Sequence, residues 1–197
     1  MKGRLIPLHR PVPHSDAISE DGVVAACATG DRAARAMLFE RHVDALHRFV
    51  ARMTCADGDA VDDLVQATFL AAFHAASRFR SGSSVRTWLC GIAANVVRTY
   101  ARGEMRRKAA MTSFGEVPAP SALSLADTVE YRELVERLPA AIAALRHDLR
   151  AAFVLVDVEG ARGADAAAAL GVPEGTLWRR LHEARAALRD ALLGGGR

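Results

Sequence analysis

The feature that most constrains this chain is a turn near its C-terminal end, Leu170-Gly171-Val172-Pro173. Gly171 can take the positive φ that a tight turn between helices needs, and Pro173 suits the first position of a following helix. Beyond the turn, apolar residues recur at helical spacing and form one narrow stripe. The stripe consists of Leu177, Leu181, Ala184 and Leu188. The segment therefore predicts the turn and second helix of a helix-turn-helix.

The opposite side of that second helix carries planar and hydrogen-bonding side chains: Trp178, Arg179, His182, Glu183 and Arg185. A helix that packs on one side and presents such groups on the other can read a DNA major groove. Arg179 can pair with guanine through two hydrogen bonds, and Glu183 can accept one from cytosine. The turn signal by itself also fits any αα-hairpin, so a surface helix at the end of a bundle stays open.

Helical spacing extends over most of the 197 residues, from about 18 to 108 and again from about 128 to 193. The first block is interrupted near 29–31, 56–58 and 80–84. No alternating run rich in Val, Ile and Thr occurs, so we expect an all-α fold without a sheet. Pro, Gly and Ser between the blocks have linker composition, and the first residues hold three prolines and no periodicity. The predicted organisation is a disordered tail at 1–17, a small helical domain at 18–108, a flexible linker at 109–128 and a second helical domain at 129–197.

Composition narrows the possible partners and sites. The net charge is only +3, but residues 78–108 hold seven Arg and one Lys against one Glu, whereas residues 57–63 hold four Asp and no base. Cys27, Cys55 and Cys90 lie far apart, which fits a reduced cytosolic protein without an intrinsic zinc site. No cofactor is expected. No apolar run reaches the roughly 18 residues that a membrane span needs. The N-terminus has no secretory pattern, so we expect a cytoplasmic protein.

An acidic face is predicted on the helix that begins near residue 59. Asp59, Asp62, Asp63 and Gln66 share this face, at a distance from a buried stripe. The stripe consists of Val61, Val65, Phe69, Ala72 and Ala76. The acids fit a solvated face with favourable first-turn charges. They also fit a magnesium site, which would need further ligands, or a docking face for a basic partner.

A basic face is predicted on the helix that begins near Ser84. Its apolar stripe consists of Val85, Trp88, Leu89, Ile92, Ala93 and Val96. A different face carries Asn95, Arg98, Arg102 and Arg106, with Thr99 at its edge. Asn can donate to and accept from a base edge, and Arg can neutralise phosphates. The preceding loop, 79–84, is flexible and rich in hydroxyls, as suits the capture of an unstacked base. We expect Trp88 to pack in the core, although it could also stack on a base.

Taken together, these motifs resemble a known family. Asp62-Asp63-Leu64-Val65-Gln66-Ala67-Thr68-Phe69, Phe79-Arg80, Ser84-Val85-Arg86-Thr87-Trp88-Leu89 and Ile92-Ala93-Ala94-Asn95 look like region 2 of a bacterial RNA polymerase sigma factor. Asp157-Val158-Glu159-Gly160 and the segment from Gly171 to Arg185 are similar to region 4. The resemblance is to the extracytoplasmic-function (ECF) group, which has only these two regions.

The resemblance implies a role for each face. Asp59, Asp62, Asp63 and Gln66 would dock on the clamp coiled coil of core RNA polymerase, and region 4 would contact its flap. Melted bases of the −10 element would be held by Phe79, Arg80, Ser81, Asn95, Arg98, Thr99 and Arg102. The −35 element would be read by Thr176, Trp178, Arg179, His182, Glu183 and Arg185. An anti-sigma protein is a further expected partner, since two tethered domains offer their binding faces to an inhibitor.

The sequence departs from the family pattern at several positions. Ala67 stands where a Glu is usual, so one docking carboxylate is missing. The run Arg162-Gly163-Ala164-Asp165-Ala166 lacks the usual aromatic and Ile, which predicts a thinly packed C-terminal domain. Trp178 and Glu183 stand where basic residues are common, which leaves the promoter sequence open.

Two rival functions are weighed against the sigma factor. A stand-alone helix-turn-helix regulator would bind duplex DNA tightly without polymerase. A metal-dependent nuclease would use Asp59, Asp62 and Asp63, but no segment offers the further ligands that it needs. The sequence shows no nucleophile–base pair and no phosphate-binding glycine loop, so no catalytic residue and no enzymatic activity is expected.

Overall fold

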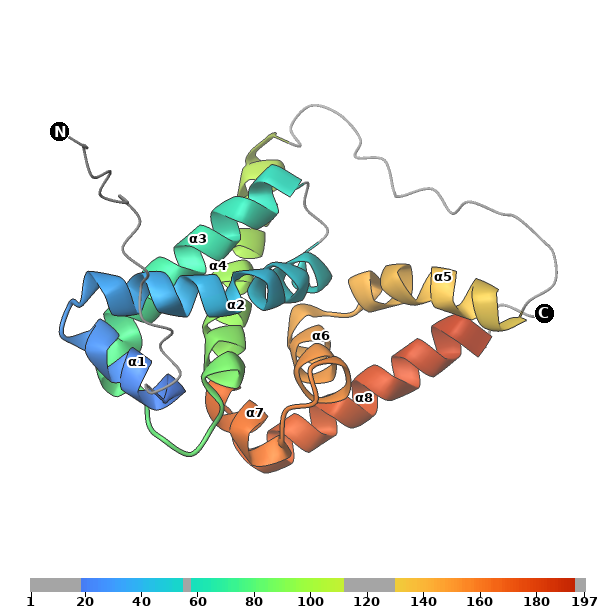
Figure 1. Ribbon diagram of the computed structural model, residues 1–197. Helices are drawn as coiled ribbons and strands as arrows, with labels where there is room; N and C mark the ends of the chain where they lie inside the picture. The colour runs from blue at the N-terminus through green and yellow to red at the C-terminus, as the bar shows by residue number, and fades with distance from the viewer. Residues whose placement is uncertain (1–18, 55–57, 112–129, 194–197) are drawn as a thin grey trace, which may run out of the picture.

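The computed structural model describes residues 19–54, 58–111 and 130–193, and every regular element in these ranges is a helix (Figure 1). The expected N-terminal tail and most of the expected linker lie outside the described residues. Among the described residues no helix is long and apolar enough to cross a membrane. The prediction of an all-α fold is confirmed.

The first helical block contains α1 (Glu20–Ala28), α2 (Arg32–Met53), α3 (Gly58–Ala75), η1 (Ala76–Arg78) and α4 (Val85–Met111). The predicted break between α1 and α2 has a clear local cause. Gly30 takes a φ of 88°, and the Asp31 carboxylate accepts hydrogen bonds from the backbone N–H groups of Ala33 and Ala34. A positive φ suits glycine, and such a carboxylate cap stabilises a helix start.

The core of this block lies where the apolar stripes predict it. The stripe predicted along α3, which ends in η1, is buried in full: Val61, Val65, Phe69, Ala72 and Ala76. In α4, Val85, Leu89 and Ala93 are buried, whereas Trp88, Ile92 and Val96 are half-buried. These side chains pack against α2, where Phe49 is fully buried. The acidic and basic faces are thereby fixed on the outside of a rigid bundle.

The second block contains α5 (Glu130–Ala144), α6 (His147–Phe153), a π-helical turn η2 (Val154–Val158), α7 (Gly163–Leu170) and α8 (Glu174–Leu193). The helix-turn-helix prediction is confirmed by α7 and α8. Gly171 takes a φ of 65°, and the N–H of Val172 donates to the carbonyl of Ala167. The predicted stripe of α8 is buried at all four positions.

The two blocks pack directly on each other. Figure 1 shows α7 against one end of α4, and the two helices are in extensive contact. One continuous cluster of buried side chains runs through both blocks. The sequence predicts two tethered helical domains but gives no sign of this contact. It buries a second face of α4, on which Thr87, Gly91 and Ala94 lie outside the predicted apolar stripe.

Candidate nucleic-acid and partner interfaces

The acidic face of α3 is exposed as a unit. Asp59, Asp62, Asp63 and Gln66 all point away from the core. The Oδ1 atom of Asp62 lies 3.3 Å from Nε2 of His47 in α2, and both side chains are open to solvent. Among the described residues, no three His, Cys, Asp or Glu side chains gather closely enough to hold a metal ion. The acidic face is therefore a row of solvent-exposed polar side chains on α3, with His47 of α2 beside it.

An exposed apolar group borders this face. Leu70 follows Gln66 by one helical turn and is 55% exposed. Phe39 of α2 is 43% exposed, and its ring centroid lies 4.8 Å from that of Phe69. Large apolar side chains left in solvent are typical of interaction sites. The sequence analysis missed both residues, although the spacing of Leu70 from Gln66 would have shown that they share a face.

The basic face of α4 exposes Asn95, Arg98, Thr99 and Arg102. The guanidinium of Arg98 donates to Oδ1 of Asn95 at 2.8 Å, and the Thr99 hydroxyl donates to the Asn95 carbonyl at 3.0 Å. The amide N–H groups of Asn95 stay on the exposed side chain, where they can meet a base edge. Arg98 thus fixes the orientation of Asn95 as well as carrying charge.

A hollow of about 390 Å³ adjoins Asn95 and Thr99 between α3 and α4. Its remaining lining is apolar, from Ala71, Ala75, Ile92 and Val96. A flat base with polar edges fits an apolar hollow flanked by hydrogen-bonding groups. The sequence analysis missed this hollow because the alanines of α3 and the stripe of α4 meet through tertiary packing.

The loop 79–84 leads into α4. The Phe79 ring packs against Trp88, with the centroids 5.1 Å apart, and both rings are half-buried. Arg80 and Ser81 are exposed. The Ser84 hydroxyl accepts a hydrogen bond from the N–H of Thr87 at 3.1 Å, which caps the start of α4. The packing prediction for Trp88 is therefore confirmed, and Phe79 is anchored rather than free.

The outward face of α8 carries Arg179, His182 and Arg185 in exposed positions. The guanidinium of Arg179 lies 2.8 Å from the Glu183 carboxylate, one turn away. Arg185 instead reaches back to Asp157, which accepts two hydrogen bonds from it at 2.9 and 2.6 Å. Arg185 therefore connects α8 to η2, whereas Arg179 is exposed and pairs with the half-buried Glu183, which also lies 3.9 Å from Arg146.

Trp178 packs on α7 while it also stands at the edge of the outward face. A Cβ added at Gly163 would collide with the indole of Trp178 and would lie 3.1 Å from its Cε2 atom. The indole N–H donates to Glu174 at 3.1 Å, and 46% of Trp178 stays exposed. Thr176 is half-buried in the first turn of α8. At the start of α7, where thin packing was expected, the indole fills the space that Gly163 leaves.

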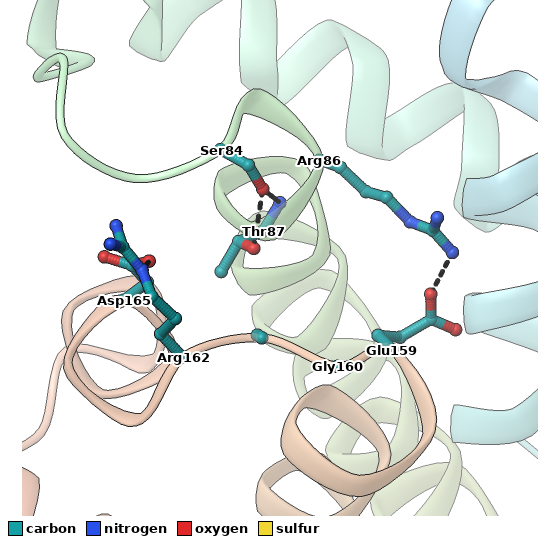
Figure 2. A pocket seen from close by; sticks show the side chains of 8 residues that line it. Ser84, Arg86, Thr87, Glu159, Gly160, Arg162 and Asp165 are labelled. Atoms are coloured by element: carbon teal, nitrogen blue, oxygen red, sulfur yellow. Dashed lines mark hydrogen bonds and ion pairs between the residues drawn. The ribbon is translucent and has the colours of Figure 1, made fainter.

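Glu159 has a role that the sequence analysis did not assign. Its side chain is 5% exposed and lies between Arg52 of α2, at 3.1 Å, and Arg86 of α4. Figure 2 shows the ion pair of Arg86 and Glu159 beside a cleft that Ser84, Thr87, Arg162 and Asp165 also line.

Burial and the nearby Glu159 charge raise the pKa of the Cys90 thiol to about 12. Cys90 is therefore a protonated core thiol.

Comparison with known proteins agrees with these features. The family described as sigma-70 region 2 matches residues 38–107, and sigma-70 region 4 matches residues 135–188. The ECF RNA polymerase sigma factor SigM of Mycobacterium tuberculosis is 36% identical over 174 residues, which cover 88% of this chain and 85% of SigM. The RNA polymerase sigma factor CarQ of Myxococcus xanthus is 33% identical, over 79% of this chain and 87% of CarQ.

Solved structures show the same likeness. CnrH in complex with the cytosolic domain of CnrY aligns with a TM-score of 0.62 and 28% identity, over 90% of this chain and 99% of that one. The sigma factor RpoE of Bartonella quintana, in complex with the anti-sigma factor NepR, aligns with a TM-score of 0.60 and 25% identity, over 81% and 96%. The chain belongs to the ECF sigma factors of RNA polymerase. It is a DNA-binding transcription initiation factor, and a stand-alone regulator is not favoured.

Proposed function

We propose that three exposed faces of this sigma factor have separate functions: one binds core RNA polymerase, one binds the −10 element and one binds the −35 element. The acidic face of α3 docks on the clamp coiled coil of core RNA polymerase, with Leu70 beside it as an apolar contact. Region 4 binds the polymerase flap. The observation that carries this assignment is that the acids are exposed together while the stripe of the same helix is fully buried. Because the buried stripe fixes how α3 is oriented, the carboxylates are available to a basic partner.

The −10 element is assigned to α4 and the preceding loop. Asn95, with its orientation fixed by Arg98, contacts the edge of a melted base, and the hollow beside it receives the base. Arg102 neutralises the adjacent phosphates. Arg80 and Ser81 hold the strand from the loop, and Phe79 supports them through its contact with Trp88.

The −35 element is assigned to α8. Arg179 and Glu183 read base edges once DNA separates their ion pair, and His182 is an auxiliary contact. Trp178 and Thr176 lie at the start of α8, where their side chains can reach DNA phosphates and the apolar edges of bases. Arg185 has a supporting role through Asp157.

Localisation and regulation follow from the same proposal. A partner of RNA polymerase works in the bacterial cytoplasm, without catalytic residues of its own and without a cofactor. CnrH was solved with the cytosolic domain of CnrY, and RpoE with a protein named as an anti-sigma factor. We expect an anti-sigma protein here too, covering the same faces of α3 and α4.

The direct test reverses one charge on the acidic face. Asp63→Arg should weaken binding to core polymerase strongly, since close charge pairs at an interface couple by about 1.5–7 kcal/mol. Asp190→Arg, an exposed reversal at the far end of α8, is the matched control. Affinity is measured by titration of labelled sigma factor with core enzyme. Equal affinities for the two variants would refute the assignment of the docking face.

A further inference from the structure

Five charged side chains of region 4 meet where α6 lies against α8. Three are arginines and two are carboxylates: Arg146, Arg179, Arg180, Asp148 and Glu183. The Glu183 carboxylate lies between two of the arginines, since its Oε1 atom is 2.8 Å from Arg179 and its Oε2 atom is 3.9 Å from Arg146. Asp148 is shared in the same way, with its Oδ2 atom 3.6 Å from both Arg146 and Arg180. Each carboxylate therefore has two cationic neighbours.

The position of Arg146 is not explained by its own helix. It occupies the N-cap position of α6, but its side chain makes no capping hydrogen bond. A cation at a helix N-terminus opposes the helix dipole, so Arg146 does not stabilise the start of α6. Its side chain is 71% exposed and lies beyond hydrogen-bonding distance of both carboxylates. Arg146 can therefore turn toward either of them at little cost.

Glu183 needs a second cation when Arg179 binds DNA. An exposed ion pair one helical turn apart is weak, so a guanine edge can draw Arg179 away from Glu183. The carboxylate then faces the negative phosphates without its closest cation, which disfavours the complex. Arg146 lies near enough to replace that cation. When Arg146 holds Oε2, the Oε1 atom stays open to accept from the N4 amine of cytosine.

The same movement leaves Asp148 with a partner. Asp148 retains Arg180, whose Nε atom is buried and makes no hydrogen bond in the free protein. A buried donor without a hydrogen bond is costly, and Asp148 can close the 3.6 Å gap to this donor once Arg146 has turned away. The buried Nε of Arg180 and the exposed position of Arg146 thus favour the same rearrangement.

We propose that Arg146, which lies outside the helix-turn-helix, is a positioning residue for −35 recognition: it takes over Glu183 when Arg179 turns to guanine. This role rests on the proposed function of α8. In the free protein Glu183 holds Arg179. In the DNA complex Arg179 binds guanine, while Arg146 holds Glu183 against cytosine. Arg146 contacts no base, so it affects sequence preference only through Glu183.

The first test measures base preference with Arg146→Ala. Holoenzyme that contains the full-length protein transcribes from a library of randomised −35 elements. Without Arg146, Glu183 keeps Arg179, so discrimination at the base pairs of both residues should fall about fivefold, the low end for loss of one base contact. Arg146→Lys keeps the cation and should recover part of both preferences. Arg189→Ala, at an exposed arginine further along α8, is the matched control and should leave both preferences unchanged.

A second test removes the charge that needs a partner. Glu183→Gln keeps the shape of the side chain but has no charge with which to hold Arg179. In that background Arg146→Ala should no longer lower discrimination at the base pair of Arg179, whereas the cytosine preference of Glu183 should be lost with or without Arg146. A phosphate contact by Arg146 would instead weaken binding to all −35 sequences equally in both backgrounds. Such a uniform loss, or unchanged preferences in Arg146→Ala, overturns the role of Arg146.

Arg179→Ala, measured in the same library, separates this role from the proposed function. If Arg179→Ala loses a base preference that Arg146→Ala keeps, α8 still reads the −35 element and only the role of Arg146 is wrong. If Arg179→Ala keeps every preference of the parent, the assignment of the reading face falls and the role of Arg146 falls with it. Because Arg146 is exposed, its variants should melt at the temperature of the parent.

Discussion

At the scale of single residues, Asn95 shows how a neighbour sets the chemistry of a base contact. Its Oδ1 atom accepts one hydrogen bond from Arg98, so one of the two lone pairs of that oxygen is engaged, while the amide N–H groups can still donate outward. A base that presents an acceptor is therefore favoured opposite Asn95. Arg102 lies further along the same face and offers a charged guanidinium with several N–H donors, which suits phosphate binding.

Three substitutions on α4 separate base reading from phosphate binding. Asn95→Ala should abolish preference at one −10 position, and Arg98→Ala should change preference there by freeing Oδ1. Arg102→Ala should weaken binding to all −10 sequences equally. It should also lower the slope of log affinity against log salt concentration by about one unit. Transcription by the holoenzyme from randomised −10 elements at several salt concentrations provides the readout. An unchanged base preference in Asn95→Ala would show that this residue does not read a base.

A second residue-scale prediction concerns the pair on α8. Arg179→Ala and Glu183→Ala should each relax preference at one −35 base pair, by about 1–3 kcal/mol, with little effect on neighbouring pairs. Arg185→Ala should lower activity without changing preference, because Arg185 is held by Asp157. A library of randomised −35 elements distinguishes the two effects. If Arg179→Ala and Glu183→Ala keep the parent's preferences, the reading face lies elsewhere on region 4.

At the scale of elements, the two helices of the helix-turn-helix are held together by an unusual pair. Trp178 of α8 covers Gly163 of α7, and the Glu174 carboxylate fixes the indole N–H. A half-exposed indole that packs on a bare backbone replaces the aromatic and aliphatic contacts expected in this motif. The orientation of α8, and so of its reading face, depends on this contact.

A double-mutant cycle measures that contact. Trp178→Ala should destabilise the protein by about 2 kcal/mol through lost apolar burial. In the presence of Trp178, Gly163→Ala should lower the free energy of unfolding. In the Trp178→Ala background, the same change should leave the free energy of unfolding unchanged or raise it. The coupling between the two substitutions should be about 1 kcal/mol. Gly175→Ala is the control, since its added Cβ would meet nothing within 4 Å. Urea unfolding of the four proteins gives the coupling, and additive effects would disprove the contact.

At the scale of the whole molecule, His147 makes the packing of the two regions sensitive to acid. Burial and the positive charge of Arg150 lower the pKa of His147 from 6.5 to about 4. Arg98 acts in the same direction, whereas Asp148 and the contact with the Ala94 backbone oppose it. The packed form therefore favours the neutral imidazole.

The expected pH dependence follows from that sign. Because the pKa is lowered on packing, the stabilisation is complete above about pH 6.5 and is lost as the pH falls toward 4. The melting temperature and the compactness of the parent should decline across this range. His147→Asn cannot titrate at this position, so its melting temperature and compactness should change less with pH. Burial also lowers the pKa of His42, but His42 is present in both proteins and so does not account for a difference between them. Parallel profiles would contradict the role of His147.

The sequence by itself determined the class of protein and the positions of the main helices. Helical spacing predicted the stripes of α3, α4 and α8, because a period of 3.6 residues places apolar side chains on one side whatever the partner helix is. Gly171 marked a helix boundary because a positive φ is a local requirement that glycine meets at little cost. The exposed acidic and basic faces followed as sides of the same helices that lie away from these stripes.

Tertiary structure decided how these faces relate to one another. Thr87, Gly91 and Ala94 are small residues without a hydrophobic pattern, so nothing in the sequence shows that α7 covers them. The burial of Glu159 depends on Arg52 and Arg86, which are 107 and 73 residues away along the chain. The hollow beside Asn95 and the fit of Trp178 on Gly163 also arise where separate helices meet. Such contacts depend on distances between elements, and helical periodicity carries no information about those distances.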